Sequence, residues 1–163
     1  MGTDRKTKIR FMRKPFLYFF ALISIVLGMG ACELDESITT TELAGNWFVN
    51  RVDMINAKSL DSEDYKTINT KQYDAYSLKE GSLLFVAKET SNFNEYLVAE
   101  YKYEGTKWKL QKQERVRISS SNKFAFNNRQ CKFKKGNAEL LEIKAKYGSE
   151  YYLYRFEKTM LNP

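Results

Sequence analysis

Hydrophobic and polar residues alternate along most of the chain from residue 43 onward. A period of two places successive side chains on opposite faces of an extended chain, and is typical of half-buried β-strands. In 96–104, for example, Leu97, Tyr101 and Tyr103 fall on one face and Val98 on the other. The strands predicted in this way are 45–54, 72–79, 83–90, 96–104, 108–118, 123–126 and 130–133, followed by a hairpin that turns at 148–149.

Glycine and asparagine occupy most of the short gaps between these runs, as expected for hairpin turns that need a positive φ. One segment, 55–71, shows no alternation and is predicted to be a long loop that can include one helical turn. The pattern predicts an all-β, antiparallel up-and-down meander of about 8–10 strands, closed as a barrel or packed as a sandwich.

The N-terminal segment has a different pattern. Six positive charges within residues 5–14 precede an apolar run over 16–30, which ends in small residues and Cys32. This is the layout of a secretory signal peptide, predicted to be helical. With a cysteine at its exit it resembles a bacterial lipoprotein signal, which implies lipidation of Cys32. The predicted organisation is a signal peptide at 1–31, a lipidated cysteine and flexible tether at 32–42, and a β-domain at 43–160.

Two other interpretations of the leader stay open, an uncleaved membrane anchor and a plain secretory signal. The run 16–31 would form about 24 Å of helix, against a hydrocarbon core of roughly 30 Å. The residues that follow it, 33–36, are mostly acidic. They resemble a surface-export tag and equally suit a solvated tether. The lipoprotein interpretation places the protein at the outer membrane, on its periplasmic face or at the cell surface.

The net charge of the chain belongs mostly to the leader and therefore says little about partners of the β-domain. The leader holds six of the 27 Lys and Arg residues and one of the 20 acidic residues, so residues 32–163 carry a net charge of only +2. Lysines alternate with glutamates along the predicted strands, as on a solvated face. Nucleic acid is therefore not expected as a partner.

The residue inventory argues against catalysis. The sequence contains no histidine, which excludes His-dependent triads and His-ligated zinc. Cys131 lies in a predicted strand and is expected to be a buried thiol. The acidic segment 61–64 does not match a calcium loop and is interpreted as solvated. We expect no enzymatic activity, no cofactor and no metal site.

The segment Gly45-Asn46-Trp47 resembles the opening Gly-x-Trp motif of lipocalins and of the lipocalin-like barrels of small bacterial lipoproteins. The segments 100–110 and 139–158 resemble the central and terminal hairpins of that family, and together the likeness spans nearly all of 43–158. The resemblance implies a barrel in which Trp47 caps the closed end and 55–71 lies over the open end. The chain departs from the family in having no disulfide and only a short C-terminal tail.

Aromatic side chains in such a barrel either fill its core or line a cavity that holds one small molecule. The leading hypothesis is an envelope-anchored lipoprotein that binds a small apolar or amphipathic ligand. The alternative is a protein–protein module, either an envelope inhibitor or immunity protein that uses the 55–71 loop, or an accessory subunit of an outer-membrane complex. The candidate contact residues are Trp47, Tyr101, Tyr103, Trp108, Tyr152 and Tyr154.

Overall fold

The computed structural model describes residues 43–163, which contain nine β-strands. The predictions made for 1–31 and 32–42, Cys32 included, lie outside the described residues. Within residues 43–163, no helix is long and apolar enough to cross a membrane. The strands are β1 (Gly45–Ala57), β2 (Tyr65–Gln72), β3 (Leu83–Glu89), β4 (Glu95–Glu104), β5 (Lys107–Arg117), β6 (Lys123–Phe126), β7 (Arg129–Gly136), β8 (Leu140–Tyr147) and β9 (Glu150–Lys158).

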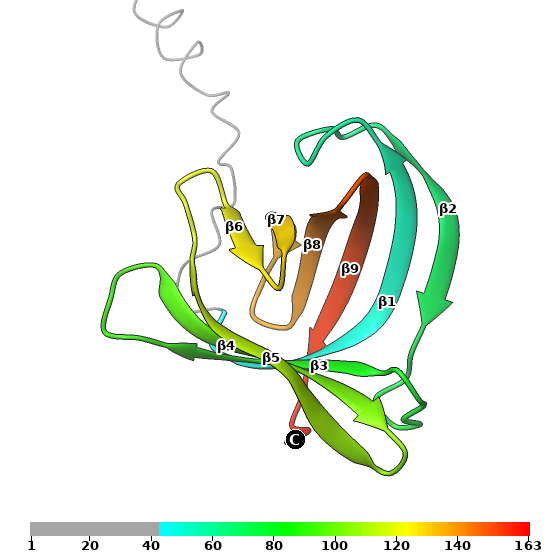
Figure 1. Ribbon diagram of the computed structural model, residues 1–163, viewed down its shortest axis with the longest axis vertical. Helices are drawn as coiled ribbons and strands as arrows, with labels where there is room; N and C mark the ends of the chain where they lie inside the picture. Colours follow the sequence, from blue (N-terminus) through cyan, green and yellow to red (C-terminus); the bar gives the residue numbers. More distant parts are fainter. Residues whose placement is uncertain (1–42) are drawn as a thin grey trace, which may run out of the picture. The chain divides into compact units, whose positions relative to one another are not determined.

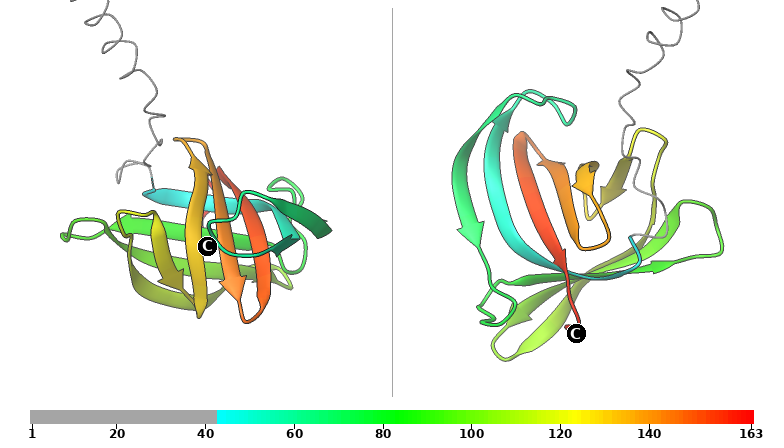
Figure 2. Two further views of the ribbon diagram at one scale, coloured as in Figure 1. Left: turned by 90° about the horizontal axis from the view of Figure 1, so that it is seen from above. Right: turned by 180° about the vertical axis from the view of Figure 1, so that it is seen from behind.

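All nine strands belong to one antiparallel sheet, with the order β5-β4-β3-β1-β9-β8-β7-β6 and β2 added beside β1. β3, β4 and β5 form one wall, β6 to β9 form the other, and the long β1 curves from one wall to the other (Figure 1). From above, the strands of the two walls cross each other (Figure 2). The predicted fold class, an all-β antiparallel meander, is therefore confirmed.

The sheet is nearly closed into a barrel. Its two end strands, β5 and β6, are consecutive in the chain. They are connected by a side-chain contact in place of a ladder, in which the Glu114 carboxylate accepts a hydrogen bond from the backbone N–H of Asn127. Asn127 and Asn128 have φ of 49° and 60° and form the turn between β6 and β7. Asparagine tolerates this left-handed conformation, which a tight hairpin requires.

The long loop predicted over 55–71 is wrong in its extent. β1 continues to Ala57, and Tyr65–Gln72 forms β2, so that the connection is only 58–64. β2 pairs with the second half of β1. Every residue of β2 after Tyr65 is exposed, so neither of its faces needs apolar residues. A strand without a buried face gives no alternation in its sequence, which is why it was not predicted.

The strand predicted over 72–79 is also wrong, because only Gln72 lies in a strand. The rest is a turn, in which the Asp74 carboxylate accepts a hydrogen bond from the backbone N–H of Tyr76 over 2.9 Å. The backbone N–H of Ser77 donates to the Asp74 carbonyl over 3.1 Å. Aspartate competes for nearby backbone donors in this way and favours turns over strands.

Candidate ligand-binding site

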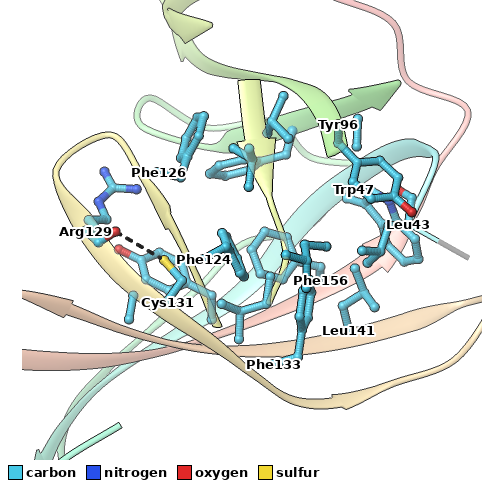
Figure 3. Close-up of a pocket in the computed structure, with 18 residues that line it drawn as sticks. Leu43, Trp47, Tyr96, Phe124, Phe126, Arg129, Cys131, Phe133, Leu141 and Phe156 are labelled. Atoms are coloured by element: carbon cyan, nitrogen blue, oxygen red, sulfur yellow. Dashed lines mark hydrogen bonds between the residues drawn. The ribbon is translucent and has the colours of Figure 1, made fainter. Parts of the chain in front are cut away.

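A cavity of about 90 Å³ lies inside the barrel, between its two walls. Its lining comes from alternate positions of most strands (Figure 3). On β8, Leu141, Ile143 and Ala145 face it, whereas their charged neighbours do not. The alternation seen in the sequence thus produces an apolar interior. The other lining residues are Leu43, Trp47, Phe85, Ala87, Tyr96, Val98, Val116, Ile118, Phe124, Phe126, Arg129, Cys131, Phe133, Tyr154 and Phe156.

Aromatic rings fill most of the space between the walls. Phe85 lies edge-on against Phe156, with ring centroids 5.4 Å apart, and Phe124 packs on Phe133 at 5.0 Å. The cavity that remains is well below the roughly 300–1,000 Å³ of pockets that enclose drug-sized ligands. It is also smaller than an engineered dry cavity of about 150 Å³ that binds benzene. It therefore suits a narrow apolar group.

One end of the cavity is closed by Trp47, Leu43 and Tyr96 (Figure 3). Trp47 is 2% exposed, and its indole Nε1–H donates to the carbonyl of Leu43 over 2.9 Å. The Lys158 ammonium lies 5.5 Å from the centroid of the indole ring. This end is shut by an anchored aromatic side chain.

The opposite end carries a buried ion pair that connects the two walls. The Arg129 guanidinium on β7 donates to the two carboxylate oxygens of Glu100 on β4, over 3.0 and 3.4 Å. Glu100 is 4% exposed. Arg129 also lies above the ring of Tyr154, 5.9 Å from its centroid. The cavity therefore changes from apolar to charged along its length.

A second, wider hollow of about 480 Å³ lies beyond Arg129 and Tyr154, which line both spaces. Its lining contains two cations, Lys71 and Arg129, and no carboxylate. The remaining lining residues are Val52, Met54, Asn69, Tyr73, Leu83, Asn127, Asn128, Tyr147 and Tyr152. A molecule that occupied both spaces would have an apolar part in the cavity and a polar part in the hollow.

Tyr154 and Cys131 are the titratable groups that burial affects most at this end. Burial raises the pKa of Tyr154 above its ordinary value and the pKa of Cys131 to about 12. Both groups are therefore neutral at physiological pH. The thiol of Cys131 is consequently a poor nucleophile, since the thiolate is the reactive form. In the described part of the chain, the Tyr154 hydroxyl makes no hydrogen bond, which leaves it available to a ligand.

Three of the six predicted contact residues lie at these spaces. Trp47 closes the cavity, Tyr154 lines both spaces, and Tyr152 lines the outer hollow. The Tyr152 hydroxyl donates to the Glu150 carboxylate, and this hydrogen bond, with burial and the charge of Glu150, raises the pKa of Tyr152 to about 12. Sequence reasoning thus identified aromatic residues at both ends.

The other three candidates, Tyr101, Tyr103 and Trp108, do not line the cavity. Tyr103 and Trp108 face each other across the β4–β5 hairpin, with ring centroids 5.2 Å apart. The residues of β4 that reach the cavity are Tyr96 and Val98, and alternation along β4 places Tyr101 and Tyr103 on the opposite face. Both faces of β4 carry apolar residues, so the sequence pattern does not indicate which face lies inside the barrel.

Sequence reasoning did not identify the Glu100–Arg129 pair or the phenylalanines of the cavity. The phenylalanines carry a signal, because Phe124, Phe126 and Phe133 occupy alternating or isolated apolar positions in short predicted strands. The ion pair carries none, because its partners are 29 positions apart and belong to different walls. Its assembly depends on the closure of the barrel.

Within residues 43–163, no group of three or more Cys, Asp or Glu side chains is placed to hold a metal ion. The lining of the two spaces offers apolar contact, hydrogen-bonding groups and one charge pair. Nothing at the two spaces places a base beside a nucleophile among the described residues.

No family model matches the chain, and none of the curated proteins matches it either. Among solved structures, the chain is similar to the siderocalin Ex-FABP, described as functioning through dual ligand specificities. The two sequences are 9% identical, and the likeness covers 75% of this chain and 78% of that chain with a TM-score of 0.48. The fold described above rests on the strand order and pairing of this chain itself.

Proposed function

We propose that this chain is an envelope-anchored lipoprotein whose barrel binds a small apolar or amphipathic ligand. The observation that carries the proposal is the cavity, which is closed and apolar at Trp47 and charged at Arg129. A pocket with apolar walls and a few convergent polar groups is the usual form of a small-molecule site.

The two spaces constrain the shape of the ligand. The inner cavity of about 90 Å³ accepts a slender apolar group, such as an unbranched hydrocarbon chain. The outer hollow of about 480 Å³ offers the Arg129 guanidinium and the hydroxyls of Tyr73 and Tyr154 to a polar group. An amphipathic molecule that enters with its apolar end first satisfies both.

Native mass spectrometry of the purified protein tests ligand binding directly. We expect a bound mass that is lost on denaturation, or binding of added medium-chain amphiphiles to the apo form. Ala145→Leu would narrow the cavity, since Ala145 lines it and is 2% exposed. This variant should weaken binding about tenfold, equivalent to roughly 1.4 kcal/mol. Ala125→Leu is the matched control, because Ala125 is exposed between two cavity residues.

The outcome of this pair of variants separates specific from general effects. Equal affinity in Ala145→Leu and the wild type would show that the ligand does not enter the cavity. An equal loss in both variants would indicate a general effect of an added side chain.

The anchoring part of the proposal rests on the sequence of the leader, with its cationic segment, apolar run and Cys32. Stable attachment needs more than one acyl chain, which a lipidated N-terminal cysteine would supply. Cys32→Ser should release the protein from the membrane fraction or block its maturation. Unchanged retention of this variant would favour an uncleaved anchor instead.

A protein partner is the second candidate, favoured by β2. This strand pairs only with β1 among the described strands, and all of its residues after Tyr65 are exposed. An exposed strand edge can accept a strand of another chain. Co-purification of a partner that is lost on Thr67→Pro, with ligand binding intact, would support this function.

A further inference from the structure

The outer face of β6, β7 and β8 carries a row of lysines. Lys123 lies opposite Lys132 in the β6–β7 ladder, and Lys132 lies opposite Lys144 in the β7–β8 ladder. Residues directly opposite each other point to the same side of a sheet, and like charges in such pairs are destabilising. This lysine row therefore requires an anion.

The connection between β1 and β2, residues 58–64 (Figure 1), supplies that anion. The two carboxylate oxygens of Asp61 accept hydrogen bonds from Lys132 and Lys123, over 2.9 and 2.8 Å. Glu63 forms an ion pair with Lys134 of β7. Two carboxylates of one loop thus contact three lysines of the sheet.

Lys144, the most buried member of the row, is less well compensated. It is 0% exposed, donates to the carbonyl of Ser62 and lies 4.9 Å from the centroid of the Tyr65 ring. Within the described part of the chain, no carboxylate lies within ion-pair distance of its ammonium. An ammonium has three donors, so this buried cation has unused capacity for an anionic acceptor.

The loop leaves space beside these contacts. A groove of about 540 Å³ is lined by Ser59, Leu60 and Asp61 of the loop and by residues of β6 to β9. The sheet side of the groove includes Lys123 and Lys146, together with Phe124 and Cys131, which also line the inner cavity. Ser119, Gln130 and Tyr151 add hydrogen-bonding groups to the lining. The groove combines cations and neutral donors, which is the chemistry that recognises phosphate.

We propose that the outer face of β6, β7 and β8 is a binding site for a phosphorylated ligand, and that Asp61 and Glu63 occupy it as an internal substitute. Asp61 holds two ammonium groups with two oxygens, as one phosphate group would. Glu63, two positions along, marks a second anion position within about 7 Å of backbone. A ligand with two phosphate groups would reproduce both.

The substitute is held by contacts that a stronger anion can replace. Asp61 and Glu63 have side chains that are 54% and 75% exposed, and exposed ion pairs contribute little to stability. Hydrogen bonds from Lys123 and Lys132 lower the pKa of Asp61 to about 2, so it is ionised at any physiological pH. The competition is therefore between two anions, a carboxylate and a phosphate.

Calorimetric titration of the full chain with pyrophosphate tests the proposal. Removing the internal competitor raises the fraction of protein with a free site, so Asp61→Asn should bind about tenfold more tightly than the wild type. Asp64→Asn is charge-matched, because Asp64 lies in the same loop and its side chain makes no ion pair among the described residues. This control should bind as the wild type does. Equal affinity in the two variants would overturn the proposal.

Two further measurements secure the result. Adding Lys132→Gln to Asp61→Asn should abolish the gain, and a gain that persists would place the ligand elsewhere. In the wild-type protein, pyrophosphate should accelerate tryptic cleavage after Lys58, whose carbonyl accepts a hydrogen bond from Tyr151 in the docked loop. No acceleration relative to sodium chloride at equal ionic strength would contradict displacement of the loop.

The same titration can distinguish the source of the phosphate. Vesicles of phosphatidylglycerol form a second arm, with phosphatidylcholine vesicles as the uncharged reference. Binding of pyrophosphate alone supports a soluble phosphorylated ligand, whereas vesicle binding that depends on Lys132 supports a lipid headgroup. If Asp61→Asn binds neither pyrophosphate nor the phosphatidylglycerol vesicles, the proposed site is wrong.

Discussion

The inner and outer faces of the sheet at β1, β8 and β9 both contain buried residues, but these residues are of opposite kinds. On the inner face, Ile143 and Phe156 border an apolar cavity. On the outer face, Lys144 and Asp53 are 0% and 1% exposed, and Leu153 lies between them in the ladder. The apolar face leaves empty space, whereas Lys144 and Asp53 on the charged face are covered completely.

The two buried charges of the outer face differ in their compensation. The Asp53 carboxylate accepts hydrogen bonds from Thr70, Arg51 and Arg155, over 2.6, 2.8 and 2.6 Å. Lys144 contacts a carbonyl and an aromatic ring. Burying a charge is tolerable when it is paired and hydrogen-bonded, and costly otherwise. The comparison predicts that Asp53 stabilises the fold and that Lys144 does not.

Asp53→Ala should cause the largest loss. Removing the carboxylate leaves two arginines without their shared partner, and breaking a buried pair costs about 3 kcal/mol of unfolding free energy. Urea denaturation measures the change, with exposed Asp64→Ala as the control. Burial raises the pKa of Asp53, but its three hydrogen bonds outweigh burial and the pKa lies below 3.8.

A lowered pKa means that the contribution of Asp53 is present at neutral pH and is lost as the pH falls through the pKa of the folded state. The difference between wild type and Asp53→Ala should therefore shrink below about pH 4. A difference that stays constant down to acid unfolding would contradict the role of the charge.

Glu100→Gln should have the second-largest effect, because it breaks the charge pair of the inner face. Arg129 would keep its place at the end of the cavity without a carboxylate, at a cost of about 2 kcal/mol. Glu104→Gln, on the same strand, removes exposed contacts with Lys102 and Lys109 and should cost less. Equal losses in the two variants would show that the inner pair has no special role.

Most of the fold could be predicted from the sequence because most strands bury one face. β6 was predicted with its observed bounds, and β3, β4 and β5 to within one residue at each end. β2 was missed because it buries neither face. Alternation of hydrophobic and polar residues thus indicates a strand with one buried and one exposed face. It gives no signal for a strand whose two faces are both exposed.

The site was less predictable, because it depends on contacts between distant strands. Trp47 and Tyr154 carry a local signal as aromatic residues in alternating runs. Glu100 looks like one of several charged residues on a solvated face, and only the approach of Arg129 from the other wall makes it part of the cavity. Lys144 was assigned to a solvated face for the same reason, and the 58–64 loop buries it.

Ile143→Val tests the inner face by a smaller change. Deleting one methylene that borders the cavity should cost about 1 kcal/mol, since the neighbouring rings can relax only partly. Ile68→Val is the matched control on β2, where Ile68 is 62% exposed. Denaturation of both variants should show a loss only for Ile143. Similar values would mean that the cavity lining is loosely packed.

Lys144→Met should have the smallest effect on stability and the opposite sign. A methionine of similar length replaces a buried ammonium that lacks a carboxylate, and such replacements are neutral or stabilising, here by less than about 1 kcal/mol.

Burial, with the neighbouring Lys134 next in effect, lowers the pKa of Lys144 below its ordinary 10.5. The unfolded chain therefore holds this proton more tightly than the folded protein does, and stability rises with pH between the two pKa values. As the pH increases through that range, the unfolding free energy of the wild type should rise relative to that of Lys144→Met. Urea denaturation at several pH values measures this difference. If the variant instead loses several kcal/mol at neutral pH, the ammonium is well compensated after all, and the contrast between Asp53 and Lys144 disappears.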